Sequence, residues 1–533
     1  MYSFDVPQGR RLAQVISAIL WCLFSGGPIF GFAALKPILV AEHVYEKSCD
    51  ISINSTISGI SNYALDPSMF GSLTTTLFQD IAGVKSSSEA KCTAQDLKLN
   101  MMFTVGAVLT NVSALAIGRL LDVYGPRFCG LIGAFFLYLA CIVFIYAKDI
   151  EASPILSILD PYLLGYASMA LGGPFAYISS FQLSNSFPHK SGTILALLTG
   201  AFDASSAVFL IYKILYTKSS GSFTISTFFK VYLLVPIFIT IVQASIMPKD
   251  SYKTPPETTL CVGDVPESSS STEAEASNSE HSPLLSQSGR RDSIGDALKQ
   301  PYADEGEEAL VKHSGGIFGI LHGYSAEYQI KTPWFYLMCA FATIQMLRLN
   351  YFVATITTQY TYLFESVASA ESLTHFFDIA LPLGGVISIP FVGLFLDHCS
   401  TTIVLAALLA VSLVIGVLGL SGSFIAGVIN VSIFVAYRPF FYTAVSDFCA
   451  KVFGFDTFGT VYGAIICTSG VFNFLQSVLD RLTHTTFNMN PIPINVTLVG
   501  LTFIIGGATL YYVHHQTGLY NQRKQRQMIS SLT

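Results

Sequence analysis

Twelve long hydrophobic runs, separated by shorter polar stretches, dominate the pattern of the chain. They are centred near residues 24, 108, 138, 170, 202, 237, 344, 384, 411, 434, 469 and 505. A helix rises about 1.5 Å per residue, so each run is long enough to cross about 30 Å of hydrocarbon. Because lipid offers no hydrogen-bond partners, spanning segments satisfy their backbone groups internally, as helices do. The pattern predicts an all-α, multi-pass integral membrane protein with twelve transmembrane helices.

Composition and charge support this prediction and orient the chain. Of the 533 residues, 52% are hydrophobic and only 12% are charged, which is too little polar surface for a soluble domain. Basic residues near the ends of the runs fall mainly on one side, which the positive-inside rule assigns to the cytosol together with both termini. The residues that set this bias are Arg10, Arg11, Arg119, Arg127, Lys190, Lys249, Lys253, Lys331, Lys451, Arg523, Lys524 and Arg526. Lys47, Lys85, Lys91, Lys148 and Lys218 are exceptions.

The sequence GRLLDVYGPR, from Gly118 to Arg127, lies between two hydrophobic runs and suits a tight cytosolic hairpin. Gly118 permits close packing of helices, and Asp122 can accept hydrogen bonds from the N-terminus of a neighbouring helix. Gly125 and Pro126 supply a turn before Arg127. We expect these residues to act as a gating motif where helices meet at the cytosolic face.

A partial copy of this motif, from Gly393 to Asp397, ends another hydrophobic run far downstream. Two copies indicate two related halves. The duplicated pattern resembles the loops between helices 2 and 3 and between helices 8 and 9 of the major facilitator superfamily, which implies two six-helix pseudo-repeat bundles. The expected parts are a first bundle at 1–247 with a lumenal loop at 42–96, a largely disordered cytosolic loop at 248–332, a second bundle at 333–515 and a cytosolic tail at 516–533.

Four segments narrow the resemblance within that superfamily. LNMMFTVG, GRLLDVYGPR, QLSNSFP and GAFDASSAVFLIYK together resemble solute-carrier family 43, and especially its fungal members. The resemblance implies a secondary transporter of a small organic solute, with neutral amino acids as the first expectation and nucleobases as the alternative. The GAFDASSAVFLIYK segment looks closer to the nucleobase carrier of that family.

Charged residues in the middle of hydrophobic runs are candidates for the transport site, because charge at such depth is unfavourable unless it faces a cavity or another charge. Asp203, Arg348 and Arg438 occupy such positions and could hold the ammonium and carboxylate groups of an amino acid. They could instead lock helices together within one bundle. A nucleobase would use polar edges and aromatic faces. The further candidates are Tyr177, Tyr351, Asn473, Gln476 and Phe441.

The first hydrophobic run contains Gly26, Gly27 and Pro28 near its middle. Proline removes a backbone donor and glycine removes side-chain packing, so the helix should be weakened there. The break can expose backbone groups to a solute, which makes Gly26 and Gly27 substrate-binding candidates. A kink where another helix crosses closely is an equally good interpretation.

The loop at 42–96 carries signs of an oxidising compartment. It contains Cys49, Cys92 and the glycosylation sequence Asn54-Ser55-Thr56. Cysteines in such a loop can form a stabilising disulfide, and free thiols are the alternative. We expect a Cys49–Cys92 disulfide and a glycan on Asn54.

The central loop holds two short regulatory patterns. Glu280, Leu284 and Leu285 match an acidic dileucine signal, which vesicle-sorting adaptors read and which favours a vacuolar or lysosomal membrane over the plasma membrane. Ser293 follows two arginines, as in a basophilic kinase site, although an ordinary solvated linker fits as well. Near the end of the loop, apolar residues share one helical face and predict a helix along the membrane surface: Ile317, Phe318, Ile320, Leu321, Tyr324 and Tyr328.

The other function classes lack their sequence signatures. The chain contains no His-Glu-x-x-His, no Gly-x-Ser-x-Gly and no Gly-x-x-x-x-Gly-Lys sequence, so we expect no enzyme, no ATP-driven pump, no metal and no cofactor. The expected partners are a small-molecule substrate, the lipid bilayer and sorting adaptors, without nucleic acid. A non-transporting nutrient sensor built on the same fold is the remaining alternative.

Overall fold

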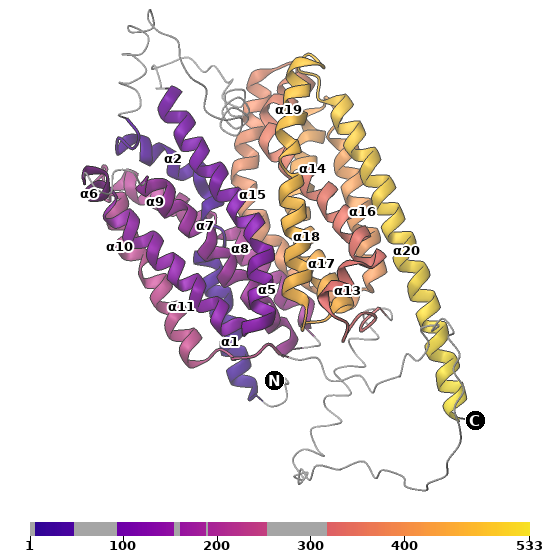
Figure 1. Cartoon of the computed structure of the whole chain (residues 1–533). Coiled ribbons are helices and arrows are strands. Elements are labelled where there is room, and N and C mark those ends of the chain that lie inside the picture. Colours follow the sequence, from indigo (N-terminus) through magenta and orange to yellow (C-terminus); the bar gives the residue numbers. More distant parts are fainter. Residues whose placement is uncertain (1–5, 47–92, 154–159, 188–189, 253–316, 533) are drawn as a thin grey trace, which may run out of the picture.

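The computed structural model describes residues 6–46, 93–153, 160–187, 190–252 and 317–532. Within these ranges the regular elements are helices, arranged in two bundles that stand side by side (Figure 1). The described N- and C-terminal ends lie toward the same end of the molecule, as the charge pattern predicts.

The N-terminal bundle begins with an interrupted first helix. α1 (Gln8–Trp21) passes into a π-helical turn (Cys22–Gly26), a 3₁₀ turn (Pro28–Gly31) and then α2 (Phe32–Ala41). The remaining elements of this bundle are α5 (Thr93–Ile145), α6 (Ala147–Ala152), α7 (Pro161–Ser180) with the 3₁₀ turn Phe181–Ser186, α8 (Ser191–Ala204), α9 (Ala207–Lys218), α10 (Ile225–Tyr232) and α11 (Leu234–Ser245).

The C-terminal bundle contains longer and more continuous helices. They are α14 (Pro333–Phe364), α15 (Val367–His398), α16 (Thr401–Leu418), α17 (Phe424–Phe453), α18 (Phe458–Phe472), α19 (Leu475–Thr485) and α20 (Ile492–Leu532), with the short α13 (Ala326–Ile330) before them. α20 continues well past the other helices of the C-terminal bundle at the end where both termini lie, so the basic tail prolongs the last helix (Figure 1).

Nine helices of the described chain are long and apolar enough to cross a membrane. One of them, Met101–Ile145, comprises two of the predicted helices, because Gly125 adopts φ 81° and ψ 170° and turns the chain between them. The other two predicted helices correspond to the interrupted α1–α2 segment and to α7, which is rich in glycine, serine and tyrosine. All twelve predicted centres therefore lie in helical segments.

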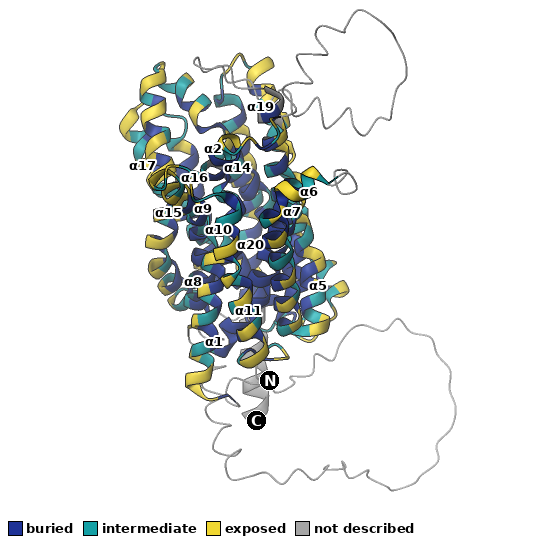
Figure 2. Cartoon of the chain, turned by 90° about the vertical axis from the view of Figure 1, so that its left-hand side faces the viewer, coloured by how far each residue is buried: buried dark blue, intermediate teal, exposed yellow. Residues whose placement is uncertain are grey.

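The outer surface of the bundles suits contact with lipid. Exposed residues lie along the outside and buried residues fill the interior (Figure 2). On α15, large apolar side chains recur at three- and four-residue spacing and are 56–71% exposed: Ile379, Leu383, Ile387, Phe391 and Leu394. An exposed apolar stripe of this kind is unfavourable in water and favourable in hydrocarbon.

The two ends of the central loop are fastened beneath the bundles. On the N-terminal side, the Tyr252 hydroxyl donates to Gln14 Oε1 at 2.6 Å, and its backbone N–H donates to Gln182 Oε1 at 3.0 Å. On the C-terminal side, Gln329 Nε2 donates to the carbonyl groups of Leu321 and Phe453 at 2.8 and 2.9 Å. Each bundle thus holds its own end of the loop.

The predicted membrane-surface helix over 317–328 was wrong. Residues 318–323 form turns, and only Ala326–Ile330 is helical. Ile317 and Leu321 are buried against the C-terminal bundle, and the N–H groups of Gly319 and Leu321 donate to the carbonyl groups of Lys451 and Val452. Those backbone bonds to the end of α17 replace the helical bonds that the apolar periodicity had suggested.

Candidate functional site between the two bundles

Asp122 joins the two bundles by capping a helix that has no cap of its own. It lies on α5, and its carboxylate accepts hydrogen bonds from the N–H groups of Gly459 and Thr460 at 2.9 and 2.6 Å. These residues form the first turn of α18, whose own N-cap residue makes no side-chain bond. The negative charge also complements the positive end of the helix dipole. The predicted acceptor role of Asp122 is present in the structure.

Asp397 makes the equivalent contact in the opposite direction. It ends α15 of the C-terminal bundle and accepts from the N–H of Thr193 at 3.2 Å and from the Thr193 hydroxyl. Thr193 lies in the first turn of α8, which likewise lacks a side-chain cap of its own. The two Gly-x-x-x-Asp copies thus cap each other's bundles and together close one end of the interface.

Glycines allow the helices to touch between these caps. The nearest neighbour of Gly118 is the backbone of Gly459, and the nearest neighbour of Gly463 is the backbone of Ala114. On the other side of the interface, a Cβ added to Gly393 would lie 2.8 Å from the Thr193 Cα atom. Because any side chain would hold the backbones apart, these glycines set the packing that brings Asp122 and Asp397 to their helix ends.

Arg127 and Gly125 fasten the same end within the N-terminal bundle. The Arg127 guanidinium donates to the carbonyl of Met247, and the backbone of Lys249 lies directly against Gly125. Any side chain at Gly125 would meet that backbone and would also strain its positive φ. The α5 turn is therefore tied to the end of α11, where the central loop begins.

Asp203 and Arg438 lie where this close packing ends. Their side chains belong to α8 and α17, one in each bundle, and the Asp203 Oδ1 to Arg438 Nη2 distance is 3.9 Å. The side chains are 8% and 18% exposed, so both charges are largely removed from solvent. Gly385 of α15 covers the pair, since a Cβ there would lie 3.4 Å from the Asp203 Cβ atom.

The break in the first helix packs directly beside Asp203. A Cβ added to Gly26 would lie 2.9 Å from the Phe202 ring, and Gly27 also faces that ring. The N–H of Gly27, freed by the break, donates to Ser205 Oγ at 2.7 Å. The helix is interrupted and α8 crosses it closely, which agrees with the kink interpretation, whereas binding of a solute at Gly26 and Gly27 stays a prediction.

Aromatic side chains surround this place. The Tyr177 ring centroid lies 4.4 Å from that of Phe202, and the Tyr177 hydroxyl donates to Thr199 Oγ1 at 3.2 Å. Phe181 reaches across the interface to Tyr462 of α18, with ring centroids 5.3 Å apart. Sequence reasoning missed Phe202, Phe181 and Tyr462, because aromatic residues are common in every hydrophobic run.

Beyond Asp203, one face of α15 is exposed in the described part of the chain. Glu371, His375 and Asp378 lie on the same helical face as Gly385 and are exposed. Toward the Asp397 end, this face packs against α8 at Gly385 and Gly393. The interface is therefore packed from the capped end as far as Asp203 and exposes titratable side chains beyond it.

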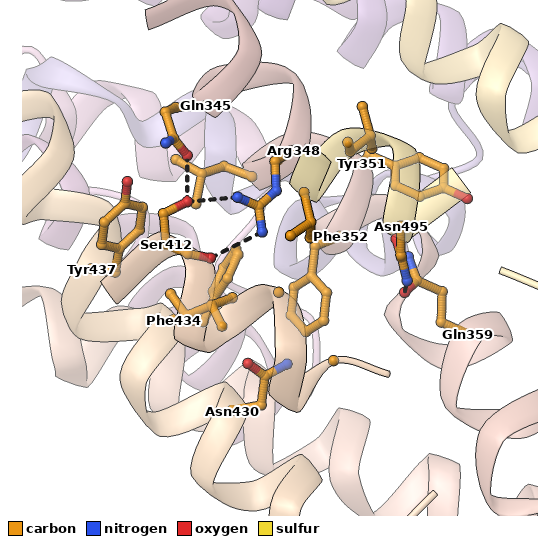
Figure 3. Close-up of a pocket in the computed structure, with 16 residues that line it drawn as sticks. Gln345, Arg348, Tyr351, Phe352, Gln359, Ser412, Asn430, Phe434, Tyr437 and Asn495 are labelled. Atoms are coloured by element: carbon orange, nitrogen blue, oxygen red, sulfur yellow. Dashed lines mark hydrogen bonds between the residues drawn. The ribbon is translucent and has the colours of Figure 1, made fainter. Parts of the chain in front are cut away.

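Arg348 and Tyr351 lie elsewhere, inside the C-terminal bundle (Figure 3). Arg348 Nη1 donates to Ser412 Oγ at 2.6 Å and to Thr502 Oγ1 at 3.1 Å, which ties α14 to α16 and α20. The Tyr351 hydroxyl is 2.8 Å from the hydroxyl of Thr483 on α19. The structure therefore brings Asp203 together with Arg438 but not with Arg348.

Asn473 and Gln476 mark the break between α18 and α19. Both are half-buried, and Asn473 Oδ1 is buried and has no hydrogen-bond partner among the residues that the structure describes. Seven predicted site residues lie outside the described residues: Cys49, Asn54, Cys92, Glu280, Leu284, Leu285 and Ser293.

The two bundles and their reciprocal caps define a membrane protein of the major facilitator fold, and solved structures share this fold. The proton:xylose symporter XylE, bound to 6-bromo-6-deoxy-D-glucose, matches with a TM-score of 0.54 and 11% identity over 95% of this chain and 96% of that chain. The human organic anion transporter MFSD10 (TETRAN) matches with a TM-score of 0.54 and 13% identity over 95% and 100%.

Curated relatives narrow the assignment, although no family model matches. Protein FMP42 of Saccharomyces cerevisiae is 47% identical over 524 residues, 95% of each chain. Equilibrative nucleobase transporter 1 of Bos taurus is 24% identical over 540 residues, 93% of this chain and 95% of that one. Large neutral amino acids transporter small subunit 3 of Homo sapiens is 28% identical over 210 residues, 39% of this chain and 32% of that one. The chain belongs to the family of FMP42, and it is a multi-pass membrane protein with the major facilitator fold.

Proposed function

We propose that this chain is a secondary transporter that moves a small organic solute of no net charge by alternating access. The ion pair between Asp203 and Arg438, one residue from each bundle, carries the proposal. Its charges cancel, so a solute with a net charge would bring an uncompensated charge into an interior of low dielectric. A solute that is neutral overall avoids this penalty.

Neutral amino acids are the first candidate, because a zwitterion complements both members of the pair. The Arg438 guanidinium can hold the carboxylate, and Asp203 can accept hydrogen bonds from the ammonium group. Both contacts would replace the 3.9 Å contact that now joins the bundles at this point. Solute binding would then change the energy of separating α8 from α17, which a carrier requires in order to couple binding to movement.

Nucleobases are the second candidate, and two observations favour them. The nucleobase transporter of Bos taurus aligns with 93% of this chain, whereas the amino acid transporter of Homo sapiens aligns with 39%. Aromatic rings also lie next to the charged pair, with Tyr177 and Phe202 4.4 Å apart. A flat base could stack on such a ring while its polar edge pairs with Asp203.

The reciprocal caps close one end of the interface in the arrangement described, and alternating access would require a second arrangement in which they are released. In the described state, Asp122 and Asp397 hold the end that the charge pattern assigns to the cytosol. Access from that side would require both carboxylates to leave their helix ends, while the exposed face around Asp378 closes against the N-terminal bundle. Rocking of two repeats about a central site is the motion that such an arrangement permits.

Uptake into vesicles that contain the purified protein tests the proposal. Labelled leucine and labelled adenine are each offered with and without a pH gradient, and unlabelled amino acids and nucleobases compete. Asp203→Asn and Arg438→Gln should each lower uptake at least tenfold, because each leaves the other charge unpaired. Two control variants remove exposed charges instead: Asp149→Asn removes a negative charge, as Asp203→Asn does, and Lys230→Gln removes a positive charge, as Arg438→Gln does. Both controls should retain uptake.

The outcomes separate the alternatives. Competition by one solute class identifies the substrate class. Wild-type uptake in both site variants would refute the role of the pair while leaving a transporter. Absence of uptake of either class, with the purified protein folded, would contradict the carrier proposal and favour a nutrient sensor.

The proposed subcellular location is the vacuolar or lysosomal membrane, with the plasma membrane as the alternative. The support is the acidic dileucine pattern formed by Glu280, Leu284 and Leu285. Sorting adaptors would be the partners that read it, and phosphorylation of the nearby Ser293 would add negative charge beside it.

A further inference from the structure

A cavity with several polar side chains in its wall lies within the C-terminal bundle, and neither Asp203 nor Arg438 lines it. It is bounded by α14, α16, α17 and α20 and has a volume of about 40 Å³. That volume holds about three water molecules or one small ion. Sites for organic solutes are typically about 300 Å³ or larger, so this cavity does not fit an amino acid or a nucleobase.

Arg348 is the one basic residue that lines this cavity, and its recorded hydrogen-bond partners are neutral. Nη1 donates to the hydroxyls of Ser412 and Thr502, and Nη2 donates to the Ser412 carbonyl at 3.1 Å. In the described part of the chain, no carboxylate forms an ion pair with this guanidinium. A cation in the interior of a bundle without a counter-ion is strongly unfavourable.

Three further residues that line the cavity have buried polar atoms. They are Gln345 Nε2, the Tyr437 hydroxyl beside Ser412, and Asn430 Oδ1, on residues that are 1%, 2% and 0% exposed. Within the described residues, Gln345 Nε2 and Asn430 Oδ1 have no hydrogen-bond partner. Gln345 Nε2 and the Tyr437 hydroxyl are donors. The Asn430 amide can also offer a donor when its oxygen and nitrogen exchange places, because the Tyr360 hydroxyl that now accepts from it can donate instead.

We propose that this cavity binds one small inorganic anion, for which chloride is the abundant candidate. The anion would neutralise Arg348 and accept hydrogen bonds from the buried donors in the cavity wall. Water alone could satisfy the donors but would leave the charge uncompensated. The proposal is independent of which solute the interface transports.

Two amide side chains line the cavity at the end of the bundle where α20 begins. Gln359 and Asn495 line it at the side opposite Gln345, and Asn495 Nδ2 donates to Gln359 Oε1 at 2.8 Å (Figure 3). Asn495 lies in the first turn of α20, directly after the loop from α19.

The anion would tie α14, α16, α17 and α20 together, so we expect the stability of the C-terminal bundle to depend on anion concentration.

Thermal unfolding of the purified full-length chain tests the proposal. Potassium chloride replaces potassium gluconate at constant total salt, because gluconate is too large for the cavity. The wild-type Tm should rise by about 2 °C or more and then saturate as chloride fills the site. Arg348→Gln should lose the saturable rise, whereas Lys230→Gln, which removes an exposed cation, should keep it.

Tyr437→Phe provides a second variant in case Arg348→Gln does not fold. It removes only one hydroxyl and keeps the aromatic ring, so the fold should tolerate it, and the chloride concentration at half saturation should rise at least threefold. No chloride-dependent rise in the wild type would show that the cavity holds water and would overturn the proposal. A saturable rise that persists unchanged in these two variants would overturn it as well, by placing the anion elsewhere.

Discussion

Replacing Asp122 with asparagine should weaken the closure of the capped end of the interface. The amide oxygen can keep the bond from Gly459, but its NH₂ group then faces the N–H of Thr460, which is now 2.6 Å from a carboxylate oxygen. One hydrogen bond to a charged acceptor is lost, at about 2 kcal/mol, and the interaction with the α18 dipole at about 0.5 kcal/mol. The total of about 2.5 kcal/mol corresponds to roughly a 70-fold shift toward the opened arrangement.

Distance measurements between two spin labels can detect this shift. Lys249 and Asp456 are exposed, belong to opposite bundles and lie near the capped end. Each is replaced by a cysteine that carries a spin label, in a variant from which the other reactive cysteines have been removed. Asp122→Asn should transfer population to a longer distance, whereas Asp149→Asn should not. A distance distribution identical to the wild type would refute the reasoning that the trans cap holds the bundles together.

Three further predictions follow from the same sequence and structure. Asp397→Asn should lengthen the same label distance, because it weakens the matching cap on α8; an unchanged distance would show that this cap has no role in closure. Cys49 and Cys92 should appear as one linked peptide in mass spectrometry of the unreduced protein, and alkylation of both as free thiols would contradict the disulfide. Changing Leu284 and Leu285 to alanine should redirect a fluorescent fusion from the vacuolar membrane; an unchanged location leaves the dileucine pattern without function.

The amino-acid sequence alone determined the class of protein and the pairing of its halves. Hydrophobic runs of membrane length can be recognised locally, because each helix satisfies its own backbone groups in lipid. The duplicated Gly-x-x-x-Asp motif was equally informative. Its geometry is local to a helix end, so Asp122 could be assigned a helix N-terminus as its partner before that helix was known.

Only the tertiary structure decided which buried charges meet. Hydrophobic periodicity places Asp203, Arg348 and Arg438 at membrane depth but does not determine the rotation of each helix about its axis. That rotation is set by side-chain packing between helices. In the structure it turns Arg438 toward Asp203 of the other bundle and turns Arg348 into the cavity beside Ser412. A residue's depth can be read from the sequence, but its direction depends on neighbours that are distant in the chain.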